Sequence, residues 1–275
     1  MRAARCGTPP RDANHFRGDF GRFRLIWERH TEFARYTVIA EGVSEDLFAE
    51  AAIDLLPAQW LSGLVGELMV ATHVAVCPRD TELSDVERLS RDLFAGNPLI
   101  GAAVSAGTGM AWTDFRLHEG GFSRWLVKDN GMTPRQLGRS VQRLLEIDTY
   151  RMLAMLALPL ANGLTPELNG ADEELGRITQ ALSDDNAHDE RALLERLTRL
   201  QVKIENRATD SSFRFGAARA YYALVQRRVQ DLREGRLPGL QTFQDFVERR
   251  LAPAMHTCQT VAERQASLLE RVART

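Results

Sequence analysis

The sequence has few cysteines, no long apolar run and almost no lysine, and the first two shortages each exclude a class of protein. Its three cysteines, Cys6, Cys77 and Cys258, lie far apart and form no CxxC or Cys/His spacing. We therefore expect free thiols in a reducing compartment. The apolar run Met152–Leu160 is well below the roughly 18 residues that a membrane span needs. The opening residues carry charge but no apolar segment, so we expect no signal peptide there.

The remaining composition is that of a folded protein. The chain has 275 residues, of which 44% are hydrophobic and 26% charged, enough for one large domain or two smaller ones. Lys and Arg together number 35 against 37 for Asp and Glu, so no overall charge attracts nucleic acid or an anionic membrane. We therefore expect no nucleic-acid partner, and no motif indicates a cofactor.

The first half of the chain alternates strand-like and short helical segments. Aromatic and β-branched residues fill the strand-like segments, and Gly, Pro and Asn separate them. Phe23–Ala40 is long for one strand, so we expect a hairpin near His30–Phe33, after a loose leading segment, Met1–Gly21. The other predicted elements are two helices, Ser44–Leu56 and Ser84–Phe94, and four strands, Leu68–Val76, Leu99–Val104, Met110–His118 and Phe122–Val127, the last two joined as a hairpin.

The second half has helical periodicity. Thr133 and Pro134 predict the start of a long helix that joins the two halves. Pro159 and Asn162-Gly163 predict its end, and its last section is apolar on every side, so Leu153 and Leu156 should both be buried there. After Pro166 we expect no strand, only helices at Asp172–Leu182, at Asp189–Ala208, from Ser211 to Arg233, and from Thr242 to the end.

These patterns predict an α+β fold, with a mostly antiparallel sheet and short helices followed by a long-helix bundle or antiparallel coiled coil. We place a sheet domain at residues 1–131 and an all-helical domain at residues 132–275, connected by helix 134–158. The last helix carries a heptad seam, and Pro253 predicts a kink in it. We expect the seam to extend beyond its cover from Val261 onward and to mediate self-association through the C-terminal helix. The seam comprises Val247, Leu251, Ala254, Cys258, Val261, Gln265, Leu268 and Val272.

Two groups of polar residues in the predicted strands are candidates for a binding site. Alternation along the strand places the members of each group on one face of the sheet. Where the two faces coincide, imidazole and carboxylate groups suit Zn, Mn or non-haem Fe, or general acid–base chemistry. The alternative is an ion-paired sheet face. No HExxH-type spacing is present, so we assign no metal ligand and no catalytic residue. The groups are Glu28, His30 and Glu32, and Asp114, Arg116 and His118.

A row of arginines on the long connecting helix is a further candidate. Arg135, Arg139 and Arg143 recur every four residues and so share one face of the helix. The row could bind an anion or an anionic lipid, and we retain Arg139 and Arg143 as candidate binding residues. With Glu146 and Asp148 nearby, a salt-bridged helix face is the alternative.

Four segments resemble one family of predicted membrane-anchored bacterial proteins with no assigned activity, domain of unknown function 3422. They occur in the family's order and extend over nearly the whole chain. The segments are RLIWERHTEF (Arg24–Phe33), WTDFRLHEGGFSRWLV (Trp112–Val127), RSVQRLLEIDTYRMLAMLALPLA (Arg139–Ala161) and LPGLQTFQDFVERRLAPAMHTC (Leu237–Cys258).

The resemblance implies an N-terminal soluble region, long helices and then apolar segments that enter the membrane. Compared with that pattern, the chain lacks the family's N-terminal start and its C-terminal membrane segments, so we expect a truncated gene product or a fragment. We expect this chain to be cytoplasmic, and longer relatives to be anchored in the inner membrane facing the cytoplasm. The layout is also similar to that of CorA-type magnesium channels, although the channel signature would lie in the missing segment.

The leading hypothesis from the sequence is a structural or assembly module without catalysis. The alternative is a metal- or anion-binding sensor or enzyme that uses the polar sheet face. A weaker alternative is the soluble part of a CorA-like ion-transport scaffold.

Overall fold

A computed structural model describes residues 12–42, 47–49, 51–83, 85–183 and 189–275. The described residues form two compact units, and each is treated by itself. The first extends to Leu68 and includes Glu87–Gly96; the second consists of Met69–Val86 and Asn97–Thr275. The predicted boundary between residues 131 and 132 concerns domains that fold separately, and it stays a prediction.

The first unit contains an antiparallel sheet of three strands, β1 (His15–Asp19), β2 (Arg24–Arg29) and β3 (Ala34–Ile39). The hairpin between β2 and β3 confirms the predicted turn near His30–Phe33. The prediction of a loose leading segment is wrong for β1, which pairs with β2 along its whole length and so acquires order that its own sequence does not specify.

Short helices accompany this sheet. They are η1 (Ala52–Leu55), α1 (Ala58–Ser62) and α2 (Val86–Leu93). The predicted helix Ser44–Leu56 lies partly outside the described residues, and its described part contains only the single turn η1. The predicted helix Ser84–Phe94 corresponds to α2, although Ser84 itself is outside the described residues.

The second unit is built on a sheet of order β4-β7-β6-β5-β8. Its pairs are antiparallel except β4 with β7, which is parallel. Many side chains of the central strands have no solvent exposure, as at Ala111 and Trp125, so this sheet is part of the core. Its strands are β4 (Thr72–Cys77), β5 (Ile100–Val104), β6 (Gly109–Thr113), β7 (Ser123–Asp129) and β8 (Gly235–Arg236).

Two details of this sheet correct the sequence predictions. β6 ends at Thr113, so residues 114–118 form a loop rather than part of a strand. The loop leads into η2 (Glu119–Gly121). β8 lies after Pro166, where we expected no strand, and pairs with Ala102 and Ala103 of β5. The open edge of β5 recruits this short segment, and Pro238 follows closely because it cannot extend the ladder.

The long helix begins as predicted but does not end as predicted. α3 (Pro134–Met155) starts at the N-cap Thr133, whose Oγ1 accepts a hydrogen bond from the backbone N–H of Gln136 at 3.3 Å. After Leu156 the chain continues as α4 (Ala157–Ser183), with Pro166 and Gly163 inside the helix. Burial of one face of α4 outweighs these local breakers, and Pro159 falls in the first turn, where its missing N–H has little effect.

The two leucines that we expected to be buried at this junction differ in their solvent exposure. Leu153 is 4% exposed, which confirms the prediction for that residue. Leu156 is 38% exposed, so the prediction is wrong there. Leu156 is the residue between α3 and α4. The nearby residues Ala154 and Ala157 are buried there instead.

α5 (Glu190–Asp231) is one helix of 42 residues, so the predicted break between Ala208 and Ser211 is wrong. Ser211 does not cap a new helix. It is buried, and its Oγ donates to the carbonyl of Arg207 at 2.7 Å, which satisfies the hydroxyl within the helix.

The C-terminal segment begins as predicted at Thr242, the N-cap of α6 (Phe243–Phe246). A π-helical turn, η3 (Val247–Leu251), joins α6 to α7 (Ala252–Arg274). Pro253 follows this turn, and the backbone N–H of Ala252 donates to the carbonyl of Val247 across the wider ring of a π-helix. The predicted kink at Pro253 stays a prediction, and the observed irregularity is the π turn that ends just before this proline.

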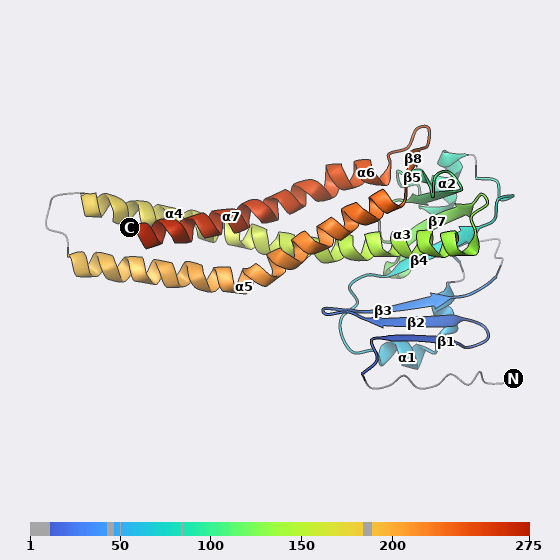
Figure 1. Cartoon of the computed structure of the whole chain (residues 1–275), viewed down its shortest axis with the longest axis horizontal. Coiled ribbons are helices and arrows are strands. Elements are labelled where there is room, and N and C mark those ends of the chain that lie inside the picture. Colours follow the sequence, from blue (N-terminus) through green and yellow to red (C-terminus); the bar gives the residue numbers. More distant parts are fainter. Residues whose placement is uncertain (1–11, 43–46, 50, 84, 184–188) are drawn as a thin grey trace. The chain divides into compact units, whose positions relative to one another are not determined.

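α4, α5 and α7 pack together as a three-helix bundle, which we call the arm (Figure 1). Each helix contributes residues at heptad spacing to one core. The prediction that the seam loses its cover at Val261 is wrong, because α4 and α5 both pack against α7. Val261, Gln265, Leu268 and Val272 are 7%, 3%, 1% and 2% exposed.

Candidate functional site

Asp114 lies at the centre of a small polar cluster just beyond the end of β6. Its carboxylate accepts hydrogen bonds from the Nδ2 of Asn97 at 2.8 Å and from the backbone N–H of Arg116 at 3.1 Å. The Nε2 of His118 is 2.9 Å from the same carboxylate. The Arg116 side chain is exposed. The structure therefore brings Asp114 and His118 together through a loop, and not through strand alternation.

The other predicted group, Glu28, His30 and Glu32, belongs to the first unit. Only Glu28 is on a strand, where it lies 3.7 Å from Arg35. His30 and Glu32 lie in the turn between β2 and β3, and the His30 ring stacks on Phe33 at 4.4 Å. Strand alternation therefore does not relate the three residues as predicted.

The arginine row on α3 is mostly exposed to solvent. Arg139 is exposed, and among the described residues it makes no hydrogen bond or ion pair. Arg143 is partly buried, and its Nε lies 3.9 Å from Asp231 of α5. The salt-bridged alternative therefore fits Arg143, whereas Arg139 projects from the helix.

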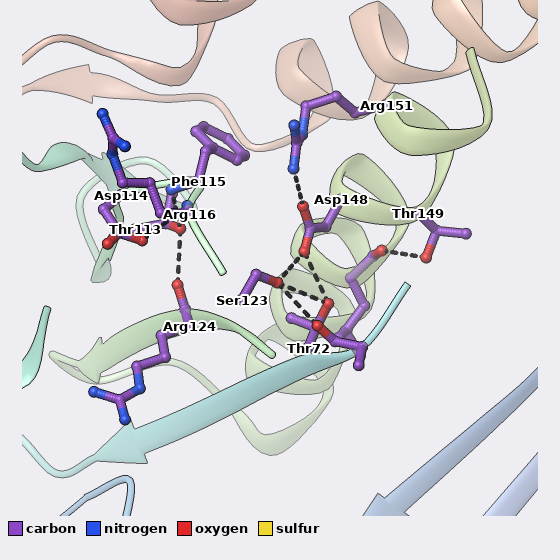
Figure 2. A network of polar contacts seen from close by, with 12 residues as sticks. Thr72, Thr113, Asp114, Phe115, Arg116, Ser123, Arg124, Asp148, Thr149 and Arg151 are labelled. Atoms are coloured by element: carbon purple, nitrogen blue, oxygen red, sulfur yellow. Dashed lines mark hydrogen bonds and ion pairs between the residues drawn. The ribbon is translucent and has the colours of Figure 1, made fainter. Parts of the chain in front are cut away.

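The most buried polar network connects α3 to the second sheet (Figure 2). Asp148 is 1% exposed, and its carboxylate accepts hydrogen bonds from Thr72 Oγ1 at 2.8 Å and from Ser123 Oγ. Arg151 Nη2 donates to the other oxygen of Asp148 at 2.8 Å. Thr72 is on β4 and Ser123 on β7, so one carboxylate joins the helix to two parallel strands.

Arg151 connects this network to an aromatic cluster. Its guanidinium lies over the ring of Phe115 at 4.9 Å, and Phe115 stacks on Phe246 of α6 at 4.1 Å. Phe115 also meets Trp125 edge to face at 5.3 Å. Phe115 has a φ of 52°, which is strained for an aromatic residue, so the surrounding contacts hold it in place.

A second buried carboxylate joins α3 to α5. Glu146 is paired with Arg228 through the Nε of that arginine, and it accepts a hydrogen bond from Gln142 at 2.9 Å. Burial alone would lower the pKa of Arg228, but the hydrogen bond and charge of Glu146 outweigh this and raise it. Arg228 therefore stays charged, and the pair fixes the two helices relative to each other.

These polar groups link α3 to the strands of the second sheet and to α5. Ser123, which donates a hydrogen bond to the buried carboxylate of Asp148, is itself only 3% exposed. Within the described ranges, no three His, Cys, Asp or Glu side chains are placed to hold a metal ion. In the same part of the chain, no helix is both long enough and apolar enough to cross a bilayer.

Asp148, Glu146 and Asn97 were not predicted from the sequence as site residues. Asp148 and Glu146 were considered only as partners for the arginine row. One signal could have identified them: both lie among the buried positions of α3, next to Leu144 and Ile147, where a carboxylate requires a partner.

Comparison with known proteins gives one finding. A family model described as "Protein of unknown function (DUF3422)" matches residues 1–275. Comparisons with curated proteins and with solved structures give no match.

Proposed function

This chain belongs to the DUF3422 family of proteins of unknown function, and we propose that it is a structural module that acts in assembly through its arm, without catalysis. The observation that carries the proposal is the continuous core of the arm, to which α4, α5 and α7 each contribute buried residues at heptad spacing. At 1.5 Å per residue, α5 alone is about 63 Å long. A bundle of this kind can join the components of an assembly and hold them at a fixed spacing.

Ion pairs between the helices support this role, because they set the relative alignment of α4, α5 and α7. Asp172 of α4 accepts hydrogen bonds from Arg264 Nε at 3.1 Å and from Arg271 Nη1 at 2.6 Å, both on α7. Glu174 of α4 accepts from Arg196 Nη2 of α5 at 2.7 Å. Oppositely charged partners at fixed levels of a bundle favour one register over its alternatives.

We propose that self-association through the C-terminal helix occurs by helix exchange, in which α7 of one copy packs against α4 and α5 of another. The seam of α7 is covered within the chain, so a second copy can use it only by supplying its own α4 and α5. The exchanged contacts are the same as those within one chain, which makes domain swapping a low-cost route to a dimer. The segment between Leu232 and Thr242 is the hinge.

Light scattering tests the proposal over protein concentrations from about 1 to 100 µM, where mass action shifts a dimer equilibrium. We expect a dimer fraction that rises with concentration. Mixed tagged and untagged chains should form mixed dimers slowly at room temperature and quickly after partial unfolding, because exchange requires α7 to leave the arm. A monomer at every concentration, or immediate mixing, would refute helix exchange.

We further propose that longer family members hold this module at the cytoplasmic face of a bacterial inner membrane. The support is the resemblance in sequence, which extends along the chain. Membrane fractionation of a full-length bacterial relative tests it, with protease added outside intact spheroplasts. Cleavage of the module by that protease, or its release by a carbonate wash, would contradict the proposal.

A further inference from the structure

A hollow of about 490 Å³ lies in the second unit, at the base of the arm, where the chain leaves α5 and enters α6. One side is the turn Leu237–Leu240, in which the N–H of Leu240 donates to the carbonyl of Leu237 at 3.2 Å. Pro238 and Gly239, with a φ of 78° at the glycine, occupy the middle of this turn. Leu237, Pro238 and Leu240 give the hollow an apolar wall, and charged residues also line it.

The charged lining residues are Arg236, Arg249 and Asp245. The backbone of Arg236 is held in β8, and its Nη2 lies 3.1 Å from Asp245. Asp245 in turn caps its own helix, because its carboxylate accepts from the backbone N–H of Thr242 at 3.3 Å. This single ion pair engages only part of the Arg236 guanidinium, which has five N–H donors. Two cations and one anion give this lining a net positive charge.

The π turn carries Arg249, the arginine of this helix that lines the hollow. The buried residues Phe243, Val247, Leu251 and Met255 are four positions apart, so three turns contain 12 residues. Three α-helical turns contain roughly 11, and the π turn accommodates the extra residue. Arg249 lines the hollow and the adjacent Arg250 does not, although both side chains are exposed. π turns of this kind occur frequently at functional sites.

The charges of the two arginines converge near Asp245. The backbone hydrogen bond from Thr242 makes the largest contribution to lowering the pKa of Asp245, and the charges of Arg236 and Arg249 lower it further. Asp245 is therefore ionised at neutral pH, and it holds Arg236 at the edge of the hollow while Arg249 remains available.

We propose that this hollow binds the phosphate group of an anionic ligand, with Arg249 and Arg236 as its two contacts. The guanidinium fork matches the geometry of phosphate oxygens and can donate two parallel hydrogen bonds to them. The apolar wall of Leu237, Pro238 and Leu240 would contact the remainder of a larger ligand. The phosphate can belong to a soluble molecule or to a phospholipid headgroup. The inference is independent of the role of the arm in assembly.

The experiment uses the full chain and two probes. Inorganic phosphate is titrated up to about 50 mM at constant ionic strength, with binding followed by calorimetry, since a site with two arginines should have a Kd on the order of 1 mM. Vesicles of phosphatidylcholine with phosphatidylglycerol, and of phosphatidylcholine alone, are tested by flotation. The variants are Arg249→Gln and Arg236→Gln, and the matched control is Arg250→Gln, which removes an exposed arginine from the same turn.

We expect at least one probe to bind, with affinity reduced about tenfold or more in Arg249→Gln and unchanged in Arg250→Gln. Saturable binding of inorganic phosphate identifies a soluble phosphate ligand, and binding only to vesicles with phosphatidylglycerol identifies a headgroup. Equal binding by the wild type, Arg249→Gln and Arg250→Gln would overturn the proposal, as would failure of the wild type to bind either probe. Arg236→Gln should also bind the same probe more weakly, because it removes the second contact. Circular dichroism checks that this variant folds.

Discussion

Replacement of Leu268 by Ala in the arm core should destabilise the second unit strongly. Leu268 is 1% exposed and lies near the end of α7, in the section that was predicted from the sequence to lack cover. A buried leucine truncated to alanine loses about 2–5 kcal/mol, from the transfer of its methyl groups and from the cavity left behind. The structure therefore predicts a large loss of stability in a section that the sequence predicted to lie beyond its cover.

The magnitude translates into a measurable melting temperature. In a unit of this size, each kcal/mol lowers the Tm by about 2–4 °C, so a loss of about 3 kcal/mol lowers it by about 6–12 °C. Far-UV circular dichroism reports the melting of the helices directly. The matched control is Leu156→Ala, the same substitution at a leucine that is 38% exposed, and it should cost less than about 1 kcal/mol.

The comparison of the two variants tests whether the end of α7 is held in a core. An equal and small loss for Leu268→Ala and Leu156→Ala would show that the end of α7 is not held in a core, and the arm would then be shorter than it is drawn in Figure 1. A Tm shift that depends strongly on protein concentration would show that a second copy supplies the cover of Leu268, as the proposed helix exchange requires.

Three further predictions follow from the contacts of the second unit. Deletion of Arg250 should convert the π turn into an α-helical one and leave the arm folded, whereas deletion of Thr260 should rotate the seam beyond it by about 100° and unfold the end of α7. Stability from Asp172 should be present above the ordinary pKa of aspartate, near 4, and lost as the pH falls through the lower pKa of the folded state. Burial raises that pKa, but hydrogen bonds from Arg264 and Arg271 outweigh it. Asp148→Asn should cost about 3–5 kcal/mol, because it leaves Arg151 without its buried partner.

Each of these has its own measurement. Proteolysis at the end of α7, compared between the two deletions, would contradict the first prediction if both deletions were cut equally fast. Thermal melting between neutral pH and about pH 3 tests the second, which fails if Asp172→Asn keeps the acid sensitivity of the wild type. Chemical denaturation tests the third prediction. The control is Asp129→Asn on β7, the strand whose Ser123 contacts Asp148, because the Asp129 carboxylate is partly exposed. Equal losses for the two variants would show that the Asp148 network does not hold α3.

Of the candidate site, the sequence predicted one pair correctly as neighbours. Asp114 and His118 do meet, although through a loop whose backbone turns at Phe115, and strand alternation gave no basis for that geometry. The sequence could not identify the buried role of Asp148, because Thr72 and Ser123 are distant from it in the chain. Hydrogen-bond partners of that kind exist only once the strands and the helix are assembled.

The sequence alone determined the features that depend on neighbouring residues. Thr133 and Thr242 cap helices because a side-chain oxygen next to a free backbone N–H is a local interaction. The hairpin between β2 and β3 and the seam of α7 from Cys258 onward are likewise set by spacing along the chain. Before Cys258 the prediction is wrong at one position, because the helix buries Met255 and not Ala254. The α+β order of the elements follows from these local signals.

The tertiary structure decided where local signals compete with burial. Pro166 and Gly163 are weak helix residues, and Gly costs about 1 kcal/mol relative to Ala in a helix, yet α4 continues through both. Burying a leucine such as Leu164 or Leu168 contributes about 1.5–3 kcal/mol, so the face packed in the arm outweighs the local preference. The pairing of β8 with β5 and the cover over Leu268 have the same origin: they depend on surfaces that distant parts of the chain provide.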